Sequence, residues 1–183
     1  MGRDTKQKLL DSFIELAKKK PLDKITVKQI SDNCGVTSQT FYNHFSDKYD
    51  LIIWAYKERV NNLLYEFEEG NLTWRQVIHG FLDGYEVNEG FIRNAILNTK
   101  GEDSYIKKSS YFLCEKIEFF VKKRRRVEEL PDNIKLLIKF NVGGMMNVIA
   151  YWLFNGMRTE KSEMVDLIID SIPKRLLDYY LDR

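Results

Sequence analysis

The side chains best suited to recognition chemistry lie together in one short stretch near the N-terminus. Ser38, Gln39, Tyr42 and Asn43 carry hydroxyl, amide and phenol groups, spaced so that they stay on the outer surface of a short helix. Such groups can hydrogen-bond base edges in a major groove or contact thymine methyl groups. The neighbouring residues placed where phosphates would pass are Thr40, His44 and Lys48. The stretch therefore predicts contact with double-stranded DNA.

Two short helices must position these side chains. Thr26 and Gln29 form a capping-box pattern that begins the first helix, and Thr37 is placed as the N-cap of the second. Thr37 also belongs to the set of residues that we expect to contact DNA. Gly35 lies between them and can take the positive φ of a tight turn. We expect Ile30, Val36 and Phe41 to form the apolar core that the two helices share. Residues 26–45 therefore predict a helix-turn-helix, which leaves one helix free to enter a groove.

Apolar residues repeat at helical spacing through most of the remaining chain. Further helices are expected over residues 9–17, 46–70, 73–85, 91–97, 104–126, 131–155 and from 162 to the end. Pro173 should kink or divide the last of these, and no segment reads as a strand ladder. We expect an all-α fold of about nine helices.

The stretch from about Lys6 to Trp54 resembles the tetracycline-repressor (TetR) family of bacterial transcription regulators. The run TFYNHFSDKYDL, residues 40–51, is its most specific part. The resemblance implies a three-helix DNA-binding head, residues 1–46, and a helical regulatory and dimerisation body, residues 47–183. It also implies a homodimer that binds a pseudo-palindromic operator, with the sign of regulation left open.

The resemblance assigns roles to individual head residues. It implies that Gln39 and Tyr42 approach bases or the adjacent backbone. It implies phosphate contacts from Thr26, through its helix N-terminus, and from His44 and Lys48. Asn43 departs from the aromatic or basic residue that the family often has there. From the residues alone, His44 could instead hydrogen-bond within the head, and Lys48 could remain a solvated charge.

Sequence patterns of common catalytic and metal sites are missing. No GxGxxG, P-loop, HExxH or GxSxG sequence occurs, and neither His44 nor His79 has a Cys or Asp partner at motif spacing. Cys34 and Cys114 lie 80 positions apart, which indicates neither a disulfide framework nor a zinc site, and Cys34 fits as core filling. We expect no enzyme, no metal and no cofactor.

Charge is distributed unevenly along the chain although the formal net charge is only +2. Residues 1–60 hold 11 Lys or Arg and 8 Asp or Glu, whereas residues 61–183 hold 18 and 19. This asymmetry is compatible with a polyanion contact near the N-terminus. The basic run at 122–126 fits a helix C-terminus better than a second nucleic-acid patch. With no signal sequence and no clear membrane span, we expect a cytoplasmic protein.

The apolar segment 131–155 contains Gly143 and Gly144 near its middle. Each glycine costs a helix about 1 kcal/mol relative to alanine, so the pair indicates close approach of another backbone. The resemblance implies a dimer interface built from the last two long helices. The residues expected in this isologous patch are Gly143, Gly144, Met145, Met146, Ala150, Trp152, Val165, Ile168, Ile169 and Ile172.

Residues 148–168, VIAYWLFNGMRTEKSEMVDLI, resemble a family subgroup related to the dihydroxyacetone kinase regulator. Within that subgroup, control by a small-molecule effector and control by a partner protein are both known. The candidate residues of an effector pocket are Tyr85, Phe112, Phe119 and Tyr151, which core packing explains equally well. The alternative function is therefore a helical protein-interaction module, a co-regulator controlled by a partner protein.

Overall fold

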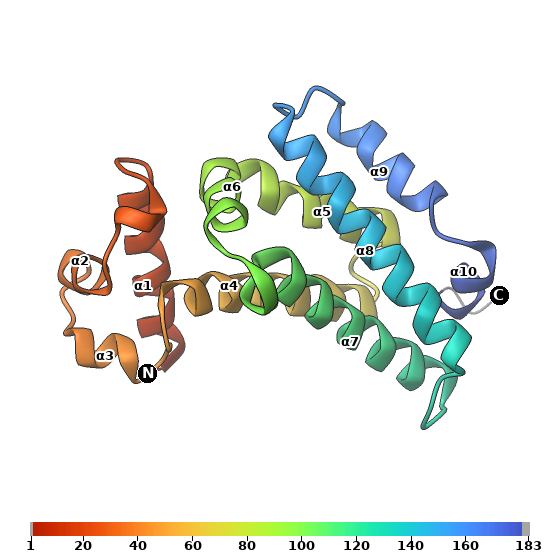
Figure 1. The fold of residues 1–183 in the computed structure, drawn as a ribbon. Helices are drawn as coiled ribbons and strands as arrows, with labels where there is room; N and C mark the ends of the chain where they lie inside the picture. Colours follow the sequence, from red (N-terminus) through yellow and green to blue (C-terminus); the bar gives the residue numbers. More distant parts are fainter. Residues whose placement is uncertain (1, 181–183) are drawn as a thin grey trace.

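The structure, a computed structural model, describes residues 2–180 (Figure 1). Between these limits the chain forms ten α-helices and two 3₁₀ turns, without a strand. The helices are α1 (Gly2–Ala17), α2 (Val27–Asn33), α3 (Ser38–Tyr42), α4 (Lys48–Glu68), α5 (Trp74–Val87), α6 (Glu89–Asn98), α7 (Tyr105–Arg125), α8 (Asp132–Phe154), α9 (Lys161–Asp170) and α10 (Lys174–Tyr180), and the turns are η1 (Leu22–Lys24) and η2 (Gly101–Asp103). The predicted all-α class is confirmed. The helix beyond the expected nine arises because Pro173 separates α9 from α10.

Helices α1, α2 and α3 form a small head at one end of the molecule (Figure 1). Its centre holds Phe13, Ile30 and Phe41, each fully buried. The Ser12 hydroxyl donates to the Ile30 carbonyl oxygen at 2.7 Å, and Asn33 Nδ2 donates to Ser12 Oγ at 3.1 Å. Because these contacts fix α2 against α1, α3 rests on a rigid platform.

The local signals of the helix-turn-helix are all present in the structure. Thr26 Oγ1 accepts the Gln29 backbone N–H at 3.2 Å, and Gln29 Oε1 accepts the Thr26 backbone N–H at 3.1 Å. Gly35 has a φ of +72°, which a residue with a Cβ rarely adopts. Thr37 Oγ1 accepts the Thr40 backbone N–H at 3.1 Å and so caps α3. The predicted capping box, turn and N-cap are confirmed.

Helix α4 leads from the head into a body formed by α4 to α10 (Figure 1). In the body α7 packs along α8, and α9 packs on α5. The body core is continuous with that of the head, and Phe13 of α1 meets Phe91 of α6 edge-to-face with ring centroids 5.1 Å apart. This contact helps to set the position of the head on the body.

The basic run 122–126 lies at the C-terminus of α7, where cations face the partial negative charge of the helix end. Lys122 pairs with Glu129 at 3.2 Å, and Lys123 pairs with Glu68 of α4 at 3.0 Å. The structure thus places the run at a helix end, as the sequence favoured, and engages its first two cations in ion pairs.

Helix α8 is the most apolar long helix of the described chain. Within residues 2–180 it alone is long and apolar enough to meet the length and composition of a membrane span. One of its faces carries buried Ile138, Met146 and Ile149 and packs in the body core. Its other face leaves Leu136 and Phe140 exposed. The apolar residues of α8 therefore form two faces, one buried in the core of the protomer and one exposed on its surface.

Candidate nucleic-acid interface

Helix α3 presents a polar ridge on the side opposite its buried residue. Phe41 is fully buried, whereas Tyr42 is 55% exposed and Gln39 and Asn43 are also exposed. Gln39 Nε2 donates to Asn43 Oδ1 at 3.0 Å, and Ser38 is half-buried. An amide uses only one of its donors in such a bond, so Gln39 keeps its carbonyl oxygen and a second hydrogen for a base edge.

The four predicted threonine and histidine positions also have contacts within the head. Thr37 and Thr40 bond to each other through their hydroxyl oxygens at 3.0 Å. Thr26 is exposed at the N-terminus of α2, where a backbone N–H group can meet a phosphate. His44 is half-buried with its ring centroid 6.4 Å from that of Phe45. These four positions line the surface around α3, and their contacts with DNA stay predictions.

Two lysines outside the predicted set lie beside this surface. Lys20 Nζ donates to Gln29 Oε1 at 2.7 Å, which brings a cation next to the α2 N-terminus. Lys6 Nζ lies 5.5 Å and 5.6 Å from the ring centroids of Phe45 and Trp54. The helix-turn-helix pattern does not single out either residue, because Lys20 follows the end of α1 and Lys6 lies within α1. The excess of cations in residues 1–60 was the only signal for them.

Lys48 is bound to the protein rather than directed outward. Its ammonium group donates to the carbonyl oxygens of Leu22, Asp23 and Ile25 at 2.7, 3.1 and 2.8 Å. Burial lowers the pKa of Lys48, and Asp23 and Asp47 offset part of that effect. Because an ammonium group has three hydrogens and all three have carbonyl acceptors, the geometry leaves none for a phosphate. Lys48 instead joins the first turn of α4 to η1. This geometry argues against the expected phosphate contact, which stays a prediction.

We expect Lys48→Met to lower the free energy of unfolding by about 1.5–3 kcal/mol, since three carbonyl groups lose a charged donor. The dependence of DNA affinity on salt should stay unchanged, because each lost phosphate contact would reduce the log–log slope by about 0.9. Urea denaturation and DNA titrations at several salt concentrations measure both quantities. Lys24→Met is the control, since Lys24 is an exposed lysine of η1 whose ammonium group lies 3.2 Å from the Asp23 carboxylate. A slope reduced by one contact would restore the phosphate role.

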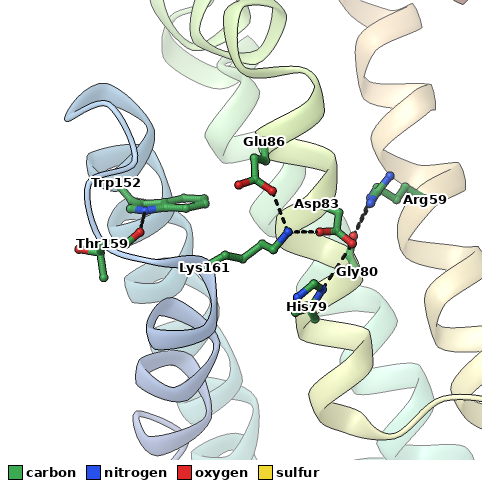
Figure 2. A network of polar contacts seen from close by, with 8 residues as sticks. All are labelled: Arg59, His79, Gly80, Asp83, Glu86, Trp152, Thr159 and Lys161. Carbon is green, nitrogen blue, oxygen red and sulfur yellow. Dashed lines mark hydrogen bonds and ion pairs between the residues drawn. The ribbon is translucent and has the colours of Figure 1, made fainter.

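Several residues expected at a dimer interface are core residues of the protomer. The buried members of that set are Met146, Trp152, Val165, Ile168 and Ile172. Trp152 Nε1, for example, donates to the Thr159 carbonyl oxygen at 2.8 Å (Figure 2). These side chains hold α8 and α9 in the body, so they cannot face a partner chain. The others are half-buried or exposed: Gly143, Gly144, Met145, Ala150 and Ile169.

A different set of α8 residues forms an open apolar surface. We call it the α8 stripe: Leu136, Phe140, Gly144, Val148 and Tyr151. Its members recur every three or four positions and therefore share one helix face. All five are exposed, and Phe140 is 80% exposed. Helical periodicity in the sequence shows that α8 has apolar residues on more than one face, but not which of these faces the protomer leaves open.

The four candidate pocket residues do not surround one cavity. Tyr85 lines a cavity of about 170 Å³. Phe112 packs against Tyr56 with ring centroids 6.2 Å apart, while Phe119 and Tyr151 are exposed on the surface. A second, apolar cavity of about 60 Å³ lies between α4, α5, α7, α8 and α9. The four candidate residues therefore do not form one pocket, and of these two cavities only the larger includes one of them.

Comparison with protein-family models gives two matches that together cover most of the chain. Residues 9–53 match the model described as bacterial regulatory proteins of the tetR family. Residues 72–174, more than half of the chain, match the model described as a transcriptional regulator C-terminal region. The first match contains the whole helix-turn-helix, and the second spans α5 to α9. They confirm the family resemblance that the sequence indicated.

Two solved structures share the fold over nearly the whole chain. The dihydroxyacetone kinase operon activator DhaS has a TM-score of 0.63 and 16% identity, covering 94% of this chain and 96% of that one. The fatty acid degradation regulator FadR from Bacillus halodurans has a TM-score of 0.55 and 14% identity, with coverages of 91% and 93%. At these identities the likeness concerns the fold alone. No curated protein sequence gives a significant match.

Proposed function

Because the chain belongs to the TetR family of bacterial transcription regulators, we propose that it binds a pseudo-palindromic operator as a homodimer. Each protomer places its α3 in the major groove of one half-site, with half-site centres about 34–36 Å apart. The proposal keeps the expected division into a head, residues 1–46, and a body, residues 47–183. Helix α4 begins two residues after that boundary, at Lys48.

The observation that carries the DNA-binding mode is the orientation of α3. Its apolar residue Phe41 is fully buried in the head, while Gln39, Tyr42 and Asn43 project outward. A rigid helix with amide and phenol groups on its open side matches the donor and acceptor pattern of base edges in a major groove. The exposed N-terminus of α2 supports a phosphate contact next to it.

The α8 stripe supports the homodimer. A Cβ built on Gly143 or Gly144 would meet nothing within 4 Å, so packing inside the protomer does not require glycine at either position. Glycine in a helix interior costs about 1 kcal/mol relative to alanine. Glycine at position 144 would be favoured if the backbone of a second copy of the chain approached α8 closely there. In a two-fold dimer both copies present the same stripe, and Phe140, Val148 and Tyr151 of each become buried.

Gln39→Ala tests base recognition. Removing an amide that reads a base edge should cost about 1–3 kcal/mol of binding free energy on the operator and much less on unrelated DNA. The operator is first identified by sequencing the DNA fragments that the purified protein retains, and both affinities are then measured by fluorescence anisotropy. Asn62→Ala, an exposed amide on α4, is the matched control. Equal losses on operator and unrelated DNA would contradict base recognition by Gln39.

The alternative is a co-regulator controlled by a partner protein. The same exposed apolar stripe on α8 supports it, because such a surface can pack against a different helical chain. The two functions differ in the mass of the purified protein. A stable dimer at micromolar concentration favours the homodimer, whereas a monomer that forms a defined complex in cell extract favours the co-regulator.

We further propose that the chain has no catalytic activity and acts in the cytoplasm. The support is the family, whose two matching models are described as bacterial regulatory proteins and as a transcriptional regulator C-terminal region. A protein that binds operator DNA must share the compartment of that DNA. Measuring the chain in cell fractions, alongside a DNA-binding marker, tests the location.

A further inference from the structure

The cavity of about 170 Å³ lies where the head meets the body. Its walls come from α1 on the head side and from α4, α5, α6 and α7 on the body side. Most of the wall is apolar, including Leu10 and Ile14 of α1 and Phe81 of α5. A dry apolar cavity of about 150 Å³ can hold benzene, so this one has room for an apolar group of similar size.

One polar group in this wall has no partner in the protein. Tyr56 lines the cavity and is only 7% exposed, and its hydroxyl forms no hydrogen bond within the described chain. An unpaired buried hydroxyl destabilises a protein, and packing alone would favour phenylalanine there. Burial raises the pKa of Tyr56, of Tyr85 and of Tyr105, the last to about 12. All three phenols are therefore neutral near pH 7, and Tyr56 has a hydrogen to donate.

A cation lines the same cavity. Arg59 lies three residues after Tyr56, so both side chains share one face of α4. Its Nε donates to the Gly80 carbonyl oxygen at 3.1 Å, and Nη2 donates to the same oxygen (Figure 2). A Cβ at Gly84 would collide with this side chain, so the glycine makes room for the guanidinium group.

Arg59 has no carboxylate partner at ion-pair distance among the described residues. Burial lowers the pKa of Arg59, and the negative charge of Asp83 offsets part of that effect. The Asp83 carboxylate already binds Lys161 at 2.7 Å and lies 3.4 Å from His79 Nδ1 (Figure 2). Lys161 in turn also pairs with Glu86 at 2.7 Å. The guanidinium group therefore keeps donors for an anion, and a guanidinium group matches the geometry of a carboxylate.

The cavity adjoins an outer groove. Leu10, Ala55 and Arg59 line both the cavity and an outer groove between α1 and α4. The shared residues place Arg59 where the groove and the cavity adjoin. An anion that entered from the groove would meet the cation first, and its apolar body could then pass inward.

We propose that this cavity binds a compact organic carboxylate, with an apolar body about the size of a benzene ring and its carboxylate held by Tyr56 and Arg59. The hydroxyl and guanidinium donors satisfy the anion, and the apolar wall excludes water from the body of the ligand. Binding does not depend on the proposed function. Only an effect of the ligand on DNA affinity would rest on that function.

Calorimetric titration with benzoate and with its neutral isostere benzamide tests the proposal. We expect wild-type protein to bind benzoate at least about tenfold more tightly than benzamide, because hydrogen bonds to a charged acceptor are the stronger ones. Tyr56→Phe should weaken benzoate binding about tenfold without lowering the Tm, since the unliganded protein loses only an unpaired hydroxyl. Arg59→Met should remove the preference for benzoate over benzamide.

Tyr65→Phe is the matched control, because Tyr65 is an exposed phenol on α4 outside the cavity. It should leave the benzoate affinity unchanged. Equal affinities of the wild-type protein for the two compounds, absence of saturable benzoate binding, or an unchanged benzoate affinity in Tyr56→Phe would each overturn the proposal. Because the titrations contain no DNA, their result is independent of the operator experiments.

Discussion

Phe140→Glu is expected to convert the protein to a monomer and to lower operator affinity by about 10²- to 10⁴-fold. Phe140 is 80% exposed in the protomer and lies in the α8 stripe, four positions before Gly144. In a two-fold dimer the substitution would bury two carboxylates in an apolar contact, which is strongly unfavourable. The second head would then no longer bind as part of the same molecule. Sedimentation velocity measures the mass, and anisotropy titrations measure the affinity.

Tyr65→Glu provides the comparison for this experiment. Tyr65 is an exposed aromatic residue on α4, away from the α8 stripe, so the same change of charge there should leave the dimer intact. Both variants should keep the helical content of the wild-type protein, since neither side chain belongs to the core. If Phe140→Glu stayed dimeric, the dimer would have to use another surface.

The head could be predicted from the sequence because its determinants are local. Thr26 and Gln29 are three residues apart, and each satisfies a backbone N–H of the other. Gly35 is required by a single backbone dihedral angle, and the positions of Phe41 and Gln39 follow from helical period. Interactions over one to four residues leave a direct trace in the sequence.

Contacts between distant segments could not be predicted in this way. Lys48 meets the carbonyl groups of residues 22–25, which belong to another element, and backbone carbonyls leave no side-chain signal. Lys161 pairs with Asp83 from 78 positions away. For the same reason the sequence could not show which apolar residues of α8 are buried in the protomer and which are exposed. Trp152 and Phe140 look equally apolar in the sequence, and only the packing of α8 against α6, α7 and α10 decides which one is covered.

Phe41→Ala should lower the free energy of unfolding by about 3–5 kcal/mol and abolish operator binding. Phe41 is fully buried, and its ring centroid lies 5.7 Å from those of Phe45 and Tyr42. Helix α3 has only five residues, so its position depends on this one buried ring rather than on helix propensity. Denaturant titration gives the change in stability, and amide hydrogen exchange should show the largest loss of protection in residues 37–45.

Tyr42→Ala distinguishes the role of α3 in DNA binding from the role of its buried residue in stability. Tyr42 is adjacent to Phe41 but 55% exposed, so its loss should cost about 1 kcal/mol of stability or less. Operator affinity should nevertheless fall, because the phenol is part of the proposed contact with DNA. A Tyr42→Ala protein that bound the operator as tightly as wild type would show that the α3 ridge does not read the DNA. Equal loss of protection in the head and the body of Phe41→Ala would show instead that α3 has no separate stability.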